Sequence, residues 1–125
     1  MAETWTSLSE DAYKAALLLQ QNERWRSMMS RAYYAVYARV AALLVDRGVT
    51  MPDGWEGPAH VLPGLIRTHL TYLDDRWAIA AWVTVLYEWR LKADYRPSAT
   101  VDMNDVRNIV NLMRNARHRL REKKP

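Results

Sequence analysis

The sequence predicts an all-α protein, an up-and-down four-helix bundle with one extra short helix. Apolar residues recur every three or four positions along most of the 125-residue chain, which is the period of an amphipathic helix. No stretch alternates apolar and polar residues for long enough to predict a half-buried strand. The length fits one domain and the chain contains no repeat or linker, so we expect residues 1–125 to form a single domain.

Two helices are predicted in the first half of the chain. Ser7 and Glu10 fit a capping box, so the first helix is expected over about residues 8–20. The second is expected over about residues 23–46, and Gly48 suits the left-handed cap that ends it. Its apolar residues step by three or four and therefore share one face: Trp25, Met29, Ala32, Val36, Val40 and Leu43.

Three helices are predicted after a Pro- and Gly-broken loop over residues 49–58. Pro58 suits the first turn of a short helix reaching about residue 69, which Pro63-Gly64 is expected to kink or split. A fourth helix is expected from Asp74 or Asp75 to about residue 93, and a fifth from Met103 to about residue 122, capped by Asp102. Their inward stripes are expected to be Ile79, Val83, Leu86 and Arg90, then Val106, Ile109, Val110, Met113, Ala116 and Leu120.

Composition narrows the function classes. The absence of cysteine excludes disulfides, Cys-ligated metals and Cys nucleophiles, and the three histidines lack metal-ligand spacing, so we expect no metal and no cofactor. The first residues do not fit a signal peptide, and no apolar run approaches the ~18 residues of a membrane span, so we expect a cytoplasmic protein without membrane contact. A net charge of +4 is compatible with nucleic-acid contact, and six Trp and seven Tyr favour interfaces.

Two sequence motifs carry a family resemblance. The second predicted helix contains Ser30-Arg31-Ala32-Tyr33-Tyr34-Ala35-Val36-Tyr37, preceded by Ala15-Ala16-Leu17-Leu18-Leu19 in the first. The end of the fourth contains Arg90-Leu91-Lys92-Ala93-Asp94-Tyr95. Over about residues 10–120 the chain therefore resembles the small bacterial HEPN domains that are associated with nucleotidyltransferases. The resemblance implies a helical bundle, often a homodimer, that works in toxin–antitoxin pairs, antiphage defence or RNA processing.

The chain departs from the ribonuclease motif of that family, in which four to six residues separate an Arg from the His that follows it. Arg67 and Arg114 lie too close to His69 and His118, and the fifth residue after Arg90 is Tyr95. Metal-free RNA cleavage works best with a group that titrates near pH 7, whereas tyrosine has a pKa near ~10 and arginine does not release its proton.

We therefore expect a binding protein that contacts RNA, a nucleotide or a protein partner, such as a nucleotidyltransferase. The alternatives are an atypical metal-independent ribonuclease, with Arg90 and Tyr95 as catalytic candidates, and a purely structural assembly subunit.

The candidate site is a groove between the second and fourth helices. We expect it to be lined by Arg31, Tyr34, Arg90, Asp94 and Tyr95. Two interpretations of Arg90 and Asp94 stay open: a simple intrahelical ion pair, or an arginine that Asp94 orients toward a phosphate or partner.

Other side chains are interpreted as mainly structural. Tyr33 is expected to pack inside with its hydroxyl bonded. The basic end from Arg114 to Lys124 is interpreted as a solvated face, with a footprint for RNA or an acidic partner as the alternative.

Overall fold

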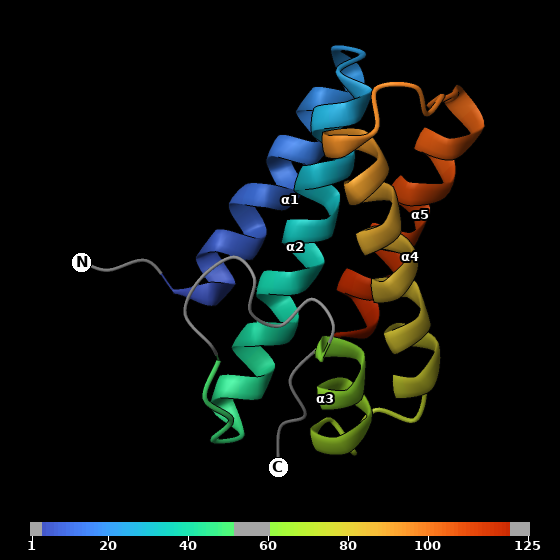
Figure 1. Cartoon of the computed structure of the whole chain (residues 1–125). Coiled ribbons are helices and arrows are strands. Elements are labelled where there is room, and N and C mark those ends of the chain that lie inside the picture. Colours follow the sequence, from blue (N-terminus) through green and yellow to red (C-terminus); the bar gives the residue numbers. More distant parts are fainter. Residues whose placement is uncertain (1–3, 52–60, 121–125) are drawn as a thin grey trace.

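The computed structural model describes residues 4–51 and 61–120, and these form five α-helices without a strand. The helices are α1 (Trp5–Gln21), α2 (Trp25–Asp46), α3 (Leu62–His69), α4 (Arg76–Tyr95) and α5 (Met103–Arg119). Figure 1 shows α1, α2, α4 and α5 running up, down, up and down along the long axis, with short α3 at one end. The predicted fold class is confirmed.

Helix α2 lies at the centre of the bundle. It packs against all four other helices, and 12 of its 22 residues are buried. Five of its six predicted inward residues are buried, and Trp25 is half-buried. All six predicted inward residues of α5 are buried as well. The predicted rows of α2 and α5 thus lie in the core, and α2, as the central helix, also buries seven residues outside its predicted row.

The start of α1 differs from the prediction. Thr4, not Ser7, is the N-cap: its hydroxyl accepts a hydrogen bond from the Ser7 amide at 3.0 Å, while the Ser7 hydroxyl accepts one from the Thr4 amide at 3.1 Å. The capping box therefore comes three residues earlier, because a serine at the third helical position replaces the expected glutamate. Glu10 is instead bonded to Arg117 of α5.

Other helix ends also shift. Helix α2 begins at Trp25 rather than residue 23, because Glu23 has a left-handed backbone (φ 57°) that a helix cannot contain. Helix α3 begins at Leu62, so Pro63 lies in its first turn, where no amide donor is needed, and neither kinks nor splits it. Pro58, its expected start, is outside the described residues. Gly48 has the predicted left-handed conformation (φ 81°).

The C-terminal ends of α4 and α5 also differ from the predicted ends by a few residues. Helix α4 begins at Arg76 after Asp75 and continues to Tyr95, two residues beyond the prediction. Helix α5 begins at Met103 with Asp102 as its cap, as predicted, but ends at Arg119 rather than near residue 122. Leu120 is the C-cap, and its carbonyl accepts a hydrogen bond from the Arg39 side chain at 2.7 Å.

The C-terminal end of α4 is held by one arginine of α2. The Arg26 guanidinium donates through Nη1 to the carbonyls of Lys92, Ala93 and Arg96 at 3.1–3.2 Å, and through Nη2 to those of Pro97 and Ala99. The carbonyls of Lys92 and Arg96 also accept backbone amides, those of Arg96 and Ala99, whereas the Ala93 carbonyl cannot be reached by an amide of residue 97, which is a proline. A cation at this helix end is also favourable for the helix dipole. We call this set of contacts the Arg26 clamp.

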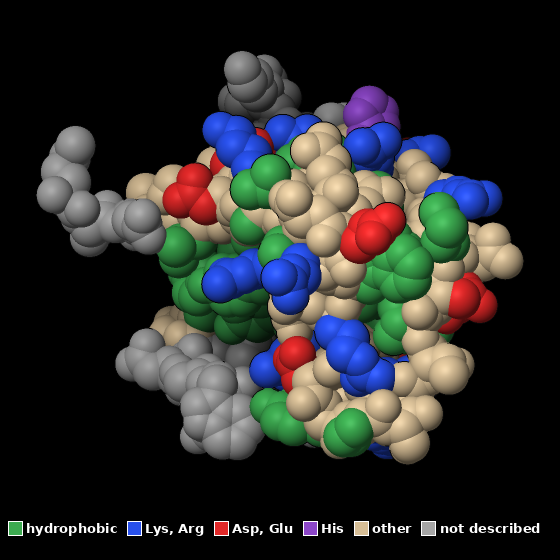
Figure 2. All heavy atoms as spheres, turned by 90° about the horizontal axis from the view of Figure 1, so that it is seen from above, with side chains coloured by type: hydrophobic (Ala, Val, Ile, Leu, Met, Phe, Trp, Pro, Cys, Tyr) green, Lys and Arg blue, Asp and Glu red, His purple; other side chains and the backbone are tan. Residues whose placement is uncertain are grey.

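The surface is rich in arginine. Figure 2, a view onto one end of the bundle, shows more Lys and Arg than acidic side chains, in agreement with the net charge of +4. Several cations cover aromatic rings: Arg47 lies 4.1 Å from the Tyr72 ring centroid and Arg117 lies 4.3 Å from that of Tyr13. Part of the tryptophan and tyrosine content thus packs under cations at the surface.

Arg26→Ala is expected to lower the free energy of unfolding by about 2–3 kcal/mol, since a charged donor set is lost and several carbonyls lose their partner. Arg24→Ala, which changes an exposed arginine two residues away, is the control and is expected to cost less than about 0.5 kcal/mol. Urea denaturation of both variants measures the difference. Equal stability of the two would contradict a structural role for the clamp.

The Glu10–Arg117 pair should make a small, pH-dependent contribution. The hydrogen bond from Arg117 holds the pKa of Glu10 below its usual value of 4.5. The stabilisation is therefore present above that pH and lost as pH falls through the folded-state pKa. Because the Glu10 side chain is 38% exposed, we expect Glu10→Gln to cost less than about 1 kcal/mol at pH 7 and progressively less as the pH falls below 4.5. Denaturation across this pH range tests this, and a difference independent of pH would refute it.

Candidate functional site

The side of α2 that faces α4 carries a regular row of polar and aromatic residues. Arg26, Ser30, Tyr33 and Tyr37 are spaced by four, three and four, so they lie along one stripe of the helix. Helix α4 packs directly against α2 and places Tyr87, Arg90 and Asp94, also three and four apart, in a matching row. The two rows meet near the end of α4 that the Arg26 clamp holds.

Asp94 joins the two helices. The Ser30 hydroxyl lies 2.7 Å and 2.6 Å from its two carboxylate oxygens, so its single proton is donated to one of them at a time. The Arg90 Nε lies 3.5 Å from Oδ2 of the same carboxylate. The Arg90 side chain is 26% exposed and that of Asp94 is 32% exposed. Arg90 and Asp94 are therefore more than an isolated pair on one helix, because α2 also holds the carboxylate.

Aromatic rings continue from this point across α2. The Tyr33 ring is buried, and its centroid lies 5.9 Å from the Arg90 guanidinium carbon and 5.5 Å from the Tyr87 ring. Tyr37 lies 6.1 Å from Tyr33 and stacks on Tyr34 at 5.9 Å. Trp5 of α1 meets Tyr37 edge-on at 5.7 Å. A row of π systems thus leads from the cation on α4 to the start of α1.

Two tyrosines of this row, Tyr33 and Tyr37, are hydrogen-bond donors rather than bases at neutral pH. Burial, followed by the influence of Tyr37, raises the pKa of Tyr33 well above its usual value, although the Arg90 charge acts in the opposite direction. Burial and then Tyr34 raise the pKa of Tyr37. Their hydroxyl groups therefore stay protonated and offer neutral O–H donors.

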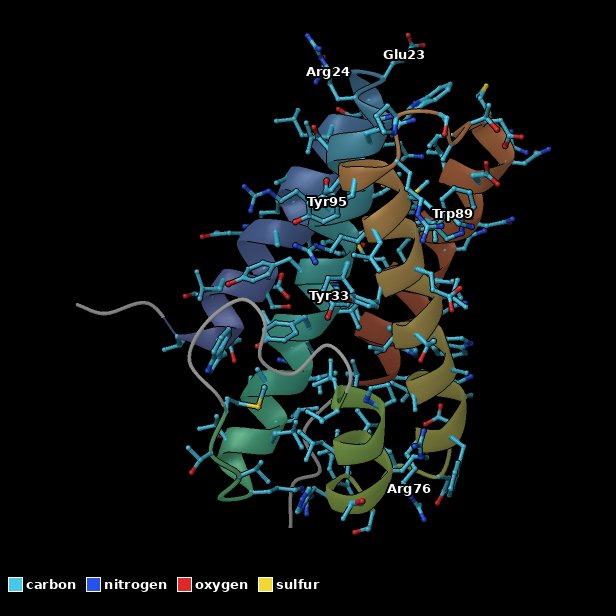
Figure 3. The ribbon with its side chains drawn as sticks, viewed as in Figure 1. Glu23, Arg24, Tyr33, Arg76, Trp89 and Tyr95 are labelled. Atoms are coloured by element: carbon cyan, nitrogen blue, oxygen red, sulfur yellow. The ribbon has the colours of Figure 1, made fainter. Side chains whose placement is uncertain are left out.

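The expectation for the Tyr33 hydroxyl was only half right. The ring packs inside, as expected, but no described hydrogen bond involves its hydroxyl. Within the described part of the chain no fully buried side-chain polar atom lacks a partner, so this hydroxyl is not completely enclosed, although Tyr33 as a whole is only 7% exposed. Figure 3 shows Tyr33 about midway along α2 and Tyr95 nearer the upper end of the bundle.

The structure brings some of the five predicted residues together and leaves others apart. Arg90 and Asp94 are in contact and lie against α2, and Tyr34 joins the same aromatic row through Tyr37. Arg31 is exposed and, two positions before Tyr33, projects about 160° away from it around the helix. Tyr95 is 64% exposed. Among the described residues no hydrogen bond, ion pair or ring contact links Arg31 or Tyr95 to Arg90.

Ser30, Tyr37 and Tyr87 belong to this arrangement but were not among the predicted site residues. The signal that could have identified them is the spacing of four and three shared by the two helices. From here on, Ser30, Tyr33, Tyr34, Tyr37, Arg90 and Asp94 are called the α2/α4 surface.

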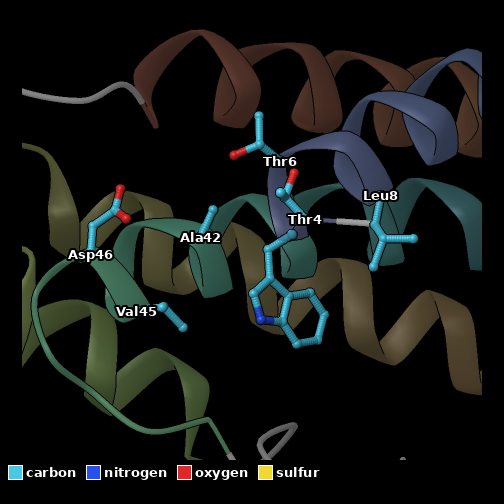
Figure 4. Close-up of a pocket in the computed structure, with 7 residues that line it drawn as sticks. Thr4, Thr6, Leu8, Ala42, Val45 and Asp46 are labelled. Atoms are coloured by element: carbon cyan, nitrogen blue, oxygen red, sulfur yellow. The ribbon is translucent and has the colours of Figure 1, made fainter. Parts of the chain in front are cut away.

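A hollow of about 510 Å³ lies elsewhere, between the start of α1 and the end of α2 (Figure 4). Ala42, Val45, Trp5 and Leu8 give it an apolar lining, and Asp46 lies at one side. It contains none of the five predicted residues, so it is not the expected groove between the second and fourth helices.

The described part of the chain contains neither a metal-site cluster nor a membrane-spanning helix. No group of three or more His, Asp or Glu side chains gathers there as a metal site. None of the five helices is both long and apolar enough to cross a membrane.

Comparison with known families identifies the class of protein that this bundle represents. The family model of the HEPN domain matches residues 2–123, so the chain belongs to the HEPN family and the predicted resemblance is confirmed. Membership supports a role of the HEPN type, either related to nucleotides or RNA or within a toxin–antitoxin pair. No curated protein and no solved structure matched the chain.

A double-mutant cycle tests the link between the two helices. Ser30→Ala removes the donor to Asp94 and is expected to lower the free energy of unfolding by about 1 kcal/mol. In the background of Asp94→Ala, which removes the acceptor, the same change should cost less, which gives a coupling energy of about 0.5–1.5 kcal/mol. Chemical denaturation of the four proteins gives the values. Strictly additive effects would mean that the hydrogen bond contributes nothing to the α2–α4 contact.

Proposed function

We propose that this HEPN protein is a binding module that holds a phosphate-bearing ligand, RNA or a nucleotide, on the α2/α4 surface. The observation that carries the proposal is the orientation of Arg90. Its Nε faces Asp94, whose carboxylate is bonded to Ser30 of the neighbouring helix, and its side chain remains a quarter exposed. A guanidinium held through Nε keeps its two terminal nitrogens for a bidentate contact with phosphate.

The tyrosines suit the rest of such a ligand. Protonated hydroxyls on Tyr33 and Tyr37 are donors that phosphate or sugar oxygens accept. Tyr34 is half-buried and stacks on Tyr37. Its ring is of the aromatic type on which nucleic-acid bases stack. The surface therefore offers one oriented cation, neutral donors and aromatic rings within a short distance.

The same chemistry favours binding over cleavage. Cleavage without a metal needs a group that exchanges protons near pH 7, and burial moves the pKa of Tyr33 and Tyr37 further from that value. The two described histidines lie on α3 and α5, outside the α2/α4 surface. Arg90 stabilises negative charge but does not transfer protons.

The setting of this module is part of the proposal. Family membership supports a place in a bacterial toxin–antitoxin or defence module. A homodimer and a nucleotidyltransferase-type partner remain predictions that rest on the family alone. Size-exclusion chromatography with light scattering addresses the first, and co-purification with the product of a neighbouring gene addresses the second.

Binding of a fluorescently labelled, unstructured RNA oligonucleotide, with ATP as competitor, tests the proposal by fluorescence anisotropy. Arg90→Ala is expected to weaken RNA binding at least about tenfold, since a charge-assisted hydrogen-bond pair is worth about 1.5–3 kcal/mol. Arg90→Lys keeps the charge but loses the two-pronged guanidinium, so its RNA affinity should lie between those of the wild type and Arg90→Ala. Lys14→Ala removes the same charge from an exposed position on α1 and should change affinity less than about twofold.

Circular dichroism establishes that the variants are folded. Equal affinity of Arg90→Ala and Lys14→Ala would overturn the proposed site. Gel analysis of the same mixtures detects cleavage. RNA cut by the wild type but not by Arg90→Ala would overturn the binding module in favour of the ribonuclease alternative.

A further inference from the structure

The outward face of α5 has an unusual composition. It carries four asparagines and two arginines, all exposed: Asn104, Arg107, Asn108, Asn111, Arg114 and Asn115. Their spacing of three and four places them on one side of the helix, opposite the buried row that contains Ile109 and Met113. We call these six residues the α5 stripe. It rises about 16 Å along the helix axis at 1.5 Å per residue.

The asparagines of the stripe do not stabilise the helix. Asparagine is among the less favourable residues inside a helix, and at exposed positions no packing requirement selects it. Asn22 illustrates a structural use, since its amide donates to the Leu18 carbonyl at 2.9 Å at the end of α1. Within the described residues, no hydrogen bond or ion pair involves the side chains of the α5 stripe. Residues that lower helix stability and make no contact that offsets this loss are typical of functional surfaces.

The charge on the stripe is also uncompensated. The neighbouring arginines of α5 are paired across the bundle, Arg117 with Glu10 at 2.8 Å and Arg119 with Asp75 at 2.9 Å. Arg107 and Arg114 have no such partner in the described structure and lie seven residues apart, two turns of the same face. The one acid within α5, Asp105, belongs to the capping box at the helix start.

We propose that the α5 stripe is a docking surface for double-helical RNA. The two arginines meet an anionic backbone, and the asparagine amides, which both donate and accept, meet groups that do the same. The 2′-hydroxyls in the wide, shallow minor groove of an RNA duplex are such groups. None of the six residues of the stripe is aromatic, and the one ring that continues this face is the exposed His118, one turn beyond Asn115. A face with so little stacking surface favours a duplex over a single strand.

Other partners fit the stripe less well. The side chains of an acidic peptide only accept hydrogen bonds, so the asparagine carbonyl oxygens would depend on the peptide's backbone N–H groups for donors. A membrane surface requires apolar side chains that insert, and the stripe has none. This inference does not depend on the α2/α4 surface, which lies on different helices and is proposed to hold a phosphate-bearing ligand through Arg90.

Binding of a blunt RNA duplex, the matching DNA duplex and a poly-glutamate peptide across a series of KCl concentrations tests the proposal. The combined variant Arg107→Ala and Arg114→Ala is expected to bind the RNA duplex at least about tenfold more weakly. It should also reduce the slope of log affinity against log salt by about 2, because two phosphate contacts are lost. The control, Lys14→Ala with Arg24→Ala, removes two exposed charges elsewhere and should keep the wild-type slope.

A second variant isolates the asparagines. Asn108→Ala with Asn111→Ala should raise the melting temperature, because alanine is the better helix former, yet weaken the RNA duplex severalfold and leave the DNA duplex nearly unchanged. A structural role for these residues would not separate stability from binding in this way. Equal loss for RNA and DNA would overturn the assignment to RNA.

The outcomes also separate the two proposed surfaces. Loss of duplex binding in the arginine variant, with normal binding in Arg90→Ala, supports the α5 stripe alone. The stripe would be overturned as an RNA surface if the arginine variant bound the duplex as well as the charge control does. It would also be overturned if poly-glutamate bound better than RNA and its binding depended on the same arginines. Failure of Arg90→Ala to weaken single-stranded RNA would overturn the α2/α4 surface and leave the stripe untouched.

Discussion

The guanidinium of Arg26 fixes where α4 ends, and the arrangement beside it depends on that position. Five carbonyls from Lys92 to Ala99 receive its hydrogen bonds, so the last turn of α4 and the following residues lie against the start of α2. Partners for the carbonyls of Lys92 and Ala93 and a cation at the helix C-terminus both stabilise this end of α4. Asp94 lies within this turn, which brings its carboxylate to Ser30 and thereby orients Arg90.

Helix α2 thus has two roles at once. One side contributes the core, where Met28, Met29 and Leu44 are fully buried, while the arginines Arg26 and Arg39 close the ends of α4 and α5. The row that faces α4 combines a hydroxyl, tyrosine rings and a cation from the neighbouring helix. Because this row rests on a rigid central helix, its polar groups have fixed positions, as a binding surface requires.

Much of the fold could be predicted because it follows from periodicity. The buried faces of α2 and α5, the cap at Asp102 and the left-handed Gly48 all come from local rules of spacing and backbone geometry. The family followed from two motifs. Contacts between helices could not be predicted in this way, since spacing shows which side of a helix a residue occupies but not what faces it. Arg90 and Asp94 were therefore identified, whereas their link to Ser30 and the Arg26 clamp were missed. Arg31 was predicted to edge the same groove with Tyr34, but it projects about 160° from Tyr33 around the helix, and no described contact joins it to Arg90.

The central claim is that Arg90, oriented through Asp94 and Ser30, is the group that meets a phosphate. The most direct measurement is an NMR titration of ¹⁵N-labelled protein with an unstructured RNA oligonucleotide, following the arginine Nε signals together with the backbone amides. The account predicts saturable shifts at the Arg90 Nε and at the amides of Ser30, Tyr33 and Asp94. Saturation of binding with these four signals unmoved would contradict it.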